Sequence, residues 1–431
     1  MCLDAGVDSL LLAHHADDQA ETVMVRMLSN YLGTGLRGIR EEAALPECEG
    51  LYGLHESGRP RESPTTQVAS GGGSTGFQIE GGGISMHRPL LPYTKAALVA
   101  TCVENGIKWF EDRTNADLTM TLRNTVRHLQ QSDQLPTALR TPRLLELASS
   151  IETREHQREI DAQYILERMT IPLDTCIGRT SFSFKQLLLE IPAEATERRV
   201  LIALALRKLV QTVSPMEVKS LQDLLPQLAF LFQTPPDSGS SQKSKAQLTG
   251  PSVAGVMITR DDPTNGQKSY TLERAQPTAQ EKQSVTRLLP NSACPKPNAT
   301  KRSWTNWQRW DGRFWLRVSP PAQTEAEECD ISVRFLAPTC LASLRETLPK
   351  AAAERLKRRL HAAPGKLRYT LPAIVQTQTQ DSSEYAATRA GVERVVALPS
   401  LGWSVGTWAA AQVDGKVGAE QWLWDIRYKK V

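Results

Sequence analysis

The sequence predicts an N-terminal α/β domain built on an incomplete parallel sheet, followed by a helical region and a small α+β domain. A short apolar strand at Ser9–Ala13 leads directly into a helical pattern that begins at Asp17. Long helical patterns fill residues 141–232, and strand-like runs dominate residues 253–431. The 431 residues also exceed what a single hydrophobic core supports, roughly 250–300 residues. We therefore expect several domains.

The predicted N-terminal domain, residues 1–140, is interrupted by an insert at about 47–83. Glycine, serine and proline dominate this insert, and such a composition cannot build an apolar core. Beyond it the pattern predicts a helix at about 93–105, a strand at 107–110 and a helix at about 117–131. Because a parallel sheet is usually entered strand first, we expect the chain to be N-terminally incomplete, lacking its first strands.

The rest of the chain divides into a helical domain over 141–232, a linker over 233–252 and an α+β domain over 253–431. Proline, serine, glutamine and lysine make up most of the predicted linker. The clearest helical patterns are 144–168 and 194–213. The strand-like runs are 255–259, 304–318, 331–335, 371–375 and 395–398, with one basic helix expected at 350–361.

Composition excludes several classes of protein. The 51 basic and 47 acidic side chains give a net charge of only +4, so an argument for nucleic-acid binding must come from local patches. No apolar run approaches the roughly 20 residues that a membrane-spanning helix needs, which excludes a membrane partner. The seven cysteines form no CxxC pair, which argues against a zinc ribbon, an iron–sulfur site or a disulfide framework.

Histidines and carboxylates are concentrated where the first strand meets its helix, in the run HHADDQAE at 14–21. Side chains at such junctions point into the crevice where open α/β sheets bind ligands. Asp18 and Glu21 lie three residues apart and share a helical face, so they can hold a cationic amine or Mg²⁺. The imidazole of His14 can move a proton near neutral pH. The alternative is an acidic first turn that merely suits the helix dipole.

A second cluster spans WFEDRTN at 109–115 and RNTVRH at 123–128. Arg123 and Arg127 lie four residues apart on one helical face, a spacing suited to phosphate or a developing anion. A solvated helix face would show the same spacing, and that alternative stays open.

Together these residues resemble a known family. The blocks HHADDQAET, HRPLLPYTK, WFEDRTNAD and RNTVRH occur in order within 9–129 and are similar to tRNA(Ile)-lysidine synthetases of the PP-loop (N-type ATP pyrophosphatase) superfamily. The resemblance implies an adenine-nucleotide α-hydrolase-like fold and a carbon–nitrogen ligase of tRNA modification that uses ATP and Mg²⁺. ATP would adenylate the 2-oxo group of the wobble cytidine in a tRNA(Ile) with a CAU anticodon. The ε-amine of free lysine would then displace AMP.

The resemblance also implies a role for each residue of the two clusters. Asp18 and Glu21 would hold the lysine substrate, and His14, Arg123 and Arg127 would be catalytic. The supporting pocket would comprise His15, Asp17, Asp112, Asn115 and Asn124.

One motif of the family is missing from the 431 residues, the phosphate-binding SGGxDS loop. The run at 70–74 imitates it but lacks the aspartate and follows no strand. We expect the loop upstream of the first residue, which leaves an inactive tRNA-binding remnant as an alternative function. A less favoured alternative is a metal-dependent phosphohydrolase with His14, His15, Asp17 and Asp18 as ligands.

Two further patches suit RNA, the tryptophan- and arginine-rich segment 304–317 and the basic segment 355–361. A hairpin that buries an aromatic face and a solvated helix face are the respective alternatives. The polar inserts indicate a eukaryotic protein, for which we expect the mitochondrial matrix or another bacterium-derived organelle. A bacterial protein would be cytoplasmic. Assembly into a homodimer is left open.

Overall fold

The computed structural model divides into two compact units, residues 1–61 with 82–163 and residues 62–81 with 164–431. It describes residues 7–45, 84–110, 122–131, 135–183, 194–232, 248–261, 269–289, 304–319, 329–378, 392–406, 408–410 and 421–429. The predicted insert at 47–83 lies outside the described residues, and so do Asp112 and Asn115.

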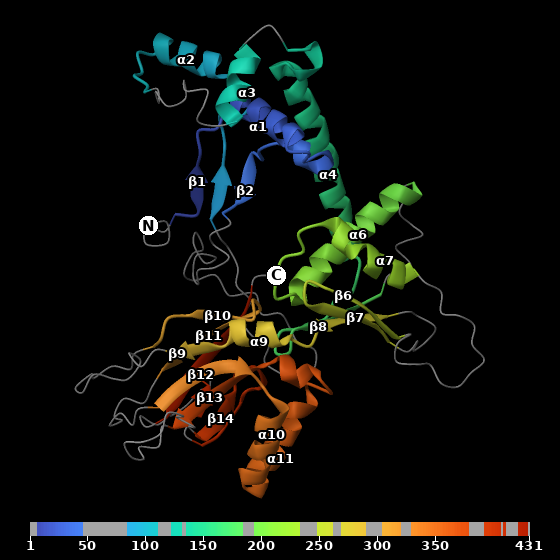
Figure 1. Ribbon diagram of the computed structural model, residues 1–431, viewed down its shortest axis with the longest axis vertical. Helices are drawn as coiled ribbons and strands as arrows, with labels where there is room; N and C mark the ends of the chain where they lie inside the picture. The colour runs from blue at the N-terminus through green and yellow to red at the C-terminus, as the bar shows by residue number, and fades with distance from the viewer. Residues whose placement is uncertain are drawn as a thin grey trace. The chain divides into compact units, whose positions relative to one another are not determined.

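The first unit contains a small mixed sheet with the strand order β1-β3-β2 (Figure 1). Its strands are β1 (Ser9–Leu11), β2 (Glu42–Ala44) and β3 (Ser85–His87). β1 and β3 pair in parallel, as expected of an α/β domain, whereas β2 runs antiparallel to β3.

Four α-helices and two 3₁₀ turns complete the described part of this unit. They are α1 (Ala16–Leu28), η1 (Gly33–Arg37), α2 (Lys95–Glu104), α3 (Leu122–Gln131), η5 (Thr137–Leu139) and α4 (Thr141–Glu167). The apolar stripe of α1 forms the core, where Val23 and Met24 pack with Val126 of α3 and Leu144 of α4. This packing fixes the start of α1 relative to α3.

The strand expected at 107–110 is not formed. Ile107 instead closes the end of α2, where its N–H donates to the carbonyl of Cys102 over 2.8 Å. Phe110 is 98% exposed. An apolar run becomes a strand only where a neighbouring strand accepts its hydrogen bonds, and the described sheet offers none to this segment.

The second unit begins with an antiparallel sheet in the order β4-β5-β8-β7-β6, covered by helices of the same region. The elements are β4 (Leu173–Asp174), β5 (Arg179–Phe182), α6 (Ala195–Val213), η6 (Leu221–Leu224), α7 (Leu225–Phe232), β6 (Thr249–Val253), β7 (Val256–Arg260) and β8 (Tyr270–Arg274). The region expected to be helical, 141–232, therefore also contains two strands. β5 alternates half-buried and buried residues and completes its pairing with β8, almost 90 residues further on. β6 begins inside the predicted linker 233–252.

Two more sheets complete the described part of the second unit, in the orders β10-β11-β17-β16 and β15-β14-β13-β12-β9. The strands are β9 (Arg287–Leu289), β10 (Gln308–Trp310), β11 (Phe314–Ser319), β12 (Cys329–Phe335), β13 (Pro372–Gln378), β14 (Val392–Leu398), β15 (Trp403–Ser404), β16 (Trp408–Ala410) and β17 (Trp422–Tyr428). The helices are α9 (Ala279–Val285), α10 (Pro338–Thr347), α11 (Lys350–His361), η9 (Leu367–Thr370) and η10 (Pro399–Leu401). Helix α11 has the predicted bounds.

The tryptophan-rich segment is a β10–β11 hairpin whose turn carries a buried ionic network. Trp310 and Trp315 are each 1% exposed, so the hairpin interpretation is confirmed for these two side chains. Asp311 in the turn accepts from Arg313 over 2.7 Å and from Arg274 of β8 over 3.2 Å. All three side chains are buried, and the network ties the hairpin to the first sheet of the unit.

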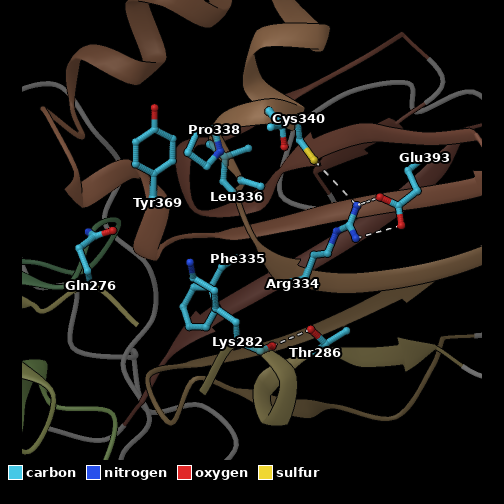
Figure 2. Close-up of a pocket in the computed structure, with 12 residues that line it drawn as sticks. Gln276, Lys282, Thr286, Arg334, Phe335, Leu336, Pro338, Cys340, Tyr369 and Glu393 are labelled. Carbon is cyan, nitrogen blue, oxygen red and sulfur yellow. Dashed lines mark hydrogen bonds and ion pairs between the residues drawn. The ribbon is translucent and has the colours of Figure 1, made fainter. Parts of the chain in front are cut away.

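Figure 2 shows a hollow of about 330 Å³ in the second unit, beside the N-terminus of α10. Arg334 of β12 reaches across β13 to form an ion pair with Glu393 of β14. Its Nη2 also lies 3.9 Å from the sulfur of Cys340. The pair with Glu393 neutralises the guanidinium, and Lys282 is the other charged side chain in the lining. Across both units, no described helix is long and apolar enough to cross a membrane.

Candidate active site

The predicted site lies between the end of β1 and the first turn of α1. The β1–β3 pairing continues to the N–H of Leu12, which donates to the carbonyl of His87 over 2.9 Å. The chain then turns at His14, and His15 caps the helix. The main-chain N–H of His15 donates to Asp18 Oδ2 over 3.0 Å, which orients the first turn of the helix.

Asp18 and Glu21 form an ion-pair cluster with two arginines of α3. Arg123 donates to Asp18 Oδ1 over 3.0 Å and to Glu21 Oε2 over 2.8 Å. Arg127 donates to Glu21 Oε1 over 2.6 Å and to Glu21 Oε2 over 3.0 Å. The two sequence clusters, about 100 residues apart in the chain, therefore meet at one place.

The carboxylates of Asp18 and Glu21 differ in how far the arginines leave them accessible to a ligand. Glu21 is only 1% exposed and both its oxygens accept from guanidinium groups. The Asp18 side chain keeps 16% exposure. The hydrogen bond with Glu21 is the largest cause that raises the pKa of Arg127 above its ordinary value. In this arrangement Asp18 is the carboxylate that a ligand can reach, and Glu21 orients the arginines.

Three of the residues predicted to support the pocket are described, and they lie around this cluster. Asp17 Oδ2 accepts the N–H of Lys95 over 2.7 Å at the start of α2. The His15 ring lies between Asp17 and Asp18, with each nitrogen 3.4 Å from a carboxylate oxygen. Asn124 is 8% exposed and lines the same hollow. Lys95 was not singled out from the sequence, although it ends the HRPLLPYTK block that carried the resemblance.

His14 lines a cleft that also includes Arg123. Burial lowers the pKa of its imidazole below the ordinary value, and Arg88, Arg123 and His15 lower it further, against the opposing effect of Asp18. The ring is therefore neutral at pH 7. Its Nδ1 is buried and has no hydrogen-bond partner among the described residues. A neutral imidazole with a free nitrogen can accept a proton.

The acidic hollow beside this cluster has a volume of about 490 Å³. Its lining residues are His15, Asp17, Asp18, Glu21, Lys95, Ala96, Arg123, Asn124, Arg127, Gln130 and Thr141. Arg123 also lines a second, larger cleft that includes His14. A cationic ligand at Asp18 would therefore lie next to a guanidinium that faces another binding space.

The described residues do not fit the role of a metal centre. They contain no group of three or more His, Cys, Asp or Glu side chains arranged to hold a metal ion. Asp18 and Glu21 are paired with arginines instead. The ligand set expected for a metal-dependent phosphohydrolase is therefore not assembled among the described residues.

Comparison with known proteins assigns the class of the first unit. Residues 1–131 match a family model described as the PP-loop domain, so the N-terminal region of this chain carries a PP-loop domain.

The chain is also similar to proteins named tRNA(Ile)-lysidine synthase. A Schizosaccharomyces pombe protein, named a probable tRNA(Ile)-lysidine synthase, is 23% identical over 94% of this chain and 71% of its own length. The enzyme of Azoarcus sp. is 34% identical over 28% of this chain, and that of Exiguobacterium sibiricum is 29% identical over 43%. The chain spans 19% and 36% of the lengths of these two bacterial relatives.

Proposed function

We propose that this protein is a tRNA(Ile)-lysidine synthase, which uses ATP to join lysine to the wobble cytidine of a tRNA with a CAU anticodon. The observation that carries the proposal is the convergence of Asp18, Glu21, Arg123 and Arg127 beside His14. Similarity to proteins of that name over most of the chain supports it, and so does the PP-loop domain.

Each group of the cluster suits one requirement of an amine-transfer reaction. Asp18 is the accessible carboxylate and would bind an ammonium group of lysine in place of its present contact with Arg123. Arg123, released from Asp18, would turn to the adenylated base. It would stabilise negative charge as AMP leaves. Glu21 would keep the other guanidinium, that of Arg127, in position.

His14 would remove the proton that the reaction releases. The amine attacks C2 of the adenylated cytidine, the bond from C2 to the adenylate oxygen breaks and AMP departs. The attacking nitrogen must lose a proton in this step. A neutral imidazole that lines the cleft beside Arg123, with no hydrogen bond to its Nδ1 among the described residues, is suited to take it.

The SGGxDS loop does not occur in the 431 residues, so the test compares two proteins. One is the chain itself, and the other is the chain preceded by a β-strand and an SGGxDS loop. We expect ATP-dependent incorporation of labelled lysine into a CAU-anticodon tRNA by the second protein and little by the first, because the loop N–H groups bind the phosphates. Absence of incorporation by both, with folding confirmed, would contradict the proposal.

We also propose that the protein works in the mitochondrial matrix, on the basis of the polar inserts in its sequence. Fractionation of cells that express the chain from its own gene, followed by protease protection of the mitochondrial fraction, tests this location.

A further inference from the structure

A large basic cleft shares Arg123 with the acidic hollow. Its volume is about 850 Å³. Its lining residues are His14, Thr22, Val25, Arg26, Ser29, Tyr31, Thr34, Gly35, Arg37, Gly38, Ile39, Arg40, Ala43, Arg88 and Arg123. Five of these are arginines, and none of the described lining residues is a carboxylate. The cleft is therefore built for a negatively charged ligand.

Arg88 is the most informative of these arginines, because it is 91% buried, with 9% of its surface exposed. Its Nη1 donates to the carbonyl of Arg40 over 2.8 Å, whereas its Nε is buried with no hydrogen-bond partner among the described residues. No described carboxylate forms an ion pair with it. A guanidinium stays charged at any physiological pH, and burying it without an anion is costly. An anionic ligand would supply the missing partner.

Main-chain carbonyls hold Arg26 in place, and Glu159 holds Arg40. Arg26 donates to the carbonyls of Gly35 and Gly38 over 2.6 and 2.7 Å and has no carboxylate partner in the described chain. Arg40 shares Glu159 with Arg37, but its own Nε is also buried and unpartnered. These side chains are ordered before any ligand binds, which lowers the entropic cost of binding.

Size and shape favour a nucleic-acid strand over a single phosphate group. The cleft is far larger than one phosphate, and Tyr31, 69% exposed, stands on its rim. An exposed aromatic ring beside a row of cations is the arrangement that binds single-stranded RNA, by stacking a base and pairing the backbone. His14 and Arg123 also line the cleft, so a strand bound here would present a base to the reaction centre.

We propose that this cleft binds the sugar–phosphate backbone of the anticodon loop beside the reacting cytidine, with Arg88 and Arg40 holding phosphate and Tyr31 stacking a base. The proposal rests on the proposed function for the identity of the RNA. It assigns the RNA to the basic cleft and lysine to the acidic hollow, and Arg123 lines both.

The test measures binding of a fluorescein-labelled CAU anticodon stem-loop to the full chain by fluorescence anisotropy at several salt concentrations. We expect Arg88→Gln and Arg40→Gln each to weaken binding about tenfold, because each removes a charge-assisted contact. Each should also reduce the slope of log affinity against log salt by about one. Arg143→Gln is the matched control, since Arg143 is an exposed arginine of α4 that does not line the cleft.

A second pair of variants separates stacking from charge. Tyr31→Ala should weaken binding about tenfold without changing the salt slope, whereas Tyr31→Phe should bind like the unmodified chain. Circular dichroism shows whether Arg88→Gln folds. If it does not, Arg40→Gln tests the role of charge instead, because the Arg40 side chain is one-third exposed.

Several results would overturn the proposal. One is that Arg88→Gln and Arg40→Gln bind the RNA as tightly as Arg143→Gln does. Another is that the unmodified chain binds no RNA. The third is that the two variants lose affinity only for ATP or inorganic phosphate, measured in parallel titrations. An assay of lysine incorporation by the loop-bearing protein distinguishes failure of the proposed function from failure of the RNA-binding cleft. Arginine-dependent RNA binding without incorporation contradicts the proposed function alone, and incorporation that survives Arg88→Gln and Arg40→Gln with unchanged RNA affinity contradicts the cleft alone.

Discussion

At the scale of single residues, Asp18 is bound on one oxygen by Arg123 and on the other by the main chain of His15. An entering ammonium group can replace the arginine without disturbing the helix cap. Glu21 has no such freedom, because two guanidinium groups occupy both its oxygens. The two carboxylates should therefore behave differently on substitution.

We expect Asp18→Asn to raise the lysine KM about tenfold or more, because it removes a charge-assisted hydrogen bond worth roughly 1.5–3 kcal/mol. The ATP KM should stay unchanged. Glu21→Gln should chiefly lower kcat, because it releases the arginines from their positions. Steady-state kinetics of the loop-bearing protein, with lysine and ATP varied in turn, measures both. A stability loss of about 0.3–1 kcal/mol with an unchanged lysine KM in both variants would instead indicate a helix-dipole role.

The pH dependence of lysine ligation should report His14. Burial lowers the pKa of this imidazole, so the neutral form persists below pH 6.5 and the rate should fall only at more acidic pH. Asp18 raises that pKa, so Asp18→Asn should move the acid limb of the profile further down. Arg88 lowers it, so Arg88→Gln should move the limb up. An acid limb that persists unchanged in His14→Gln would show that another group titrates.

At the scale of elements, the loop after α1 brings Arg37 and Arg40 to the basic cleft. The side chain of Gln19 holds it, donating to the carbonyls of Arg37 and Ile39 over 3.1 Å each and accepting from the N–H of Ile39. Gly38 lies at φ +71° in this loop, and a Cβ there would overlap the Gln19 amide. The tight fit of loop on helix thus depends on a residue without a side chain.

Gly38→Ala should destabilise the protein by at least about 1 kcal/mol more than Gly33→Ala. Both glycines have positive φ, but a Cβ at Gly33 meets no atom within 4 Å. The difference in free energy of unfolding, from urea titration followed by circular dichroism, therefore isolates the contact with Gln19. Equal losses in the two variants would show that the loop can move aside.

At the scale of the whole molecule, the buried network of Asp311, Arg274 and Arg313 joins the two halves of the second unit. Arg274 comes from the strand β8, and the other two residues belong to the β10–β11 hairpin. All three residues lie within the predicted α+β domain, whereas the β5–β8 pairing crosses the predicted boundary between that domain and the helical domain.

Asp311→Asn should cost about 3–5 kcal/mol, because it leaves the buried guanidinium of Arg313 without its anion and leaves Arg274 with Glu281 alone. Asparagine tolerates the positive φ of 46° at this position, so the substitution tests the charge. Glu393→Gln, which breaks a half-exposed pair with Arg334, should cost less than about 1 kcal/mol. Tryptophan fluorescence during urea unfolding reports this unit, which holds eight of the nine tryptophans. Similar losses in the two variants would contradict a central role for Asp311.

The sequence by itself determined the features that depend on near neighbours in the chain. The strand–helix junction at 9–28, the helix α6 and the bounds of α11 follow from apolar periodicity, which local residues set. The grouping of His14, Asp18 and Glu21 follows from their positions in one helical turn and just before it. The four ordered blocks were enough to predict the PP-loop class that the family model confirms.

Only the tertiary structure decided which distant groups meet. Arg123 and Arg127 could be placed on one face of a helix from their spacing, but their pairing with Glu21 depends on how α3 packs against α1. The strand β5 forms inside a region of helical pattern because β8 completes its hydrogen bonds, and 107–110 fails to form a strand because no neighbour does. Arg88 indicates an anion-binding site only because its guanidinium is buried without a carboxylate partner among the described residues. Long-range packing sets burial and partners, and no local pattern encodes it.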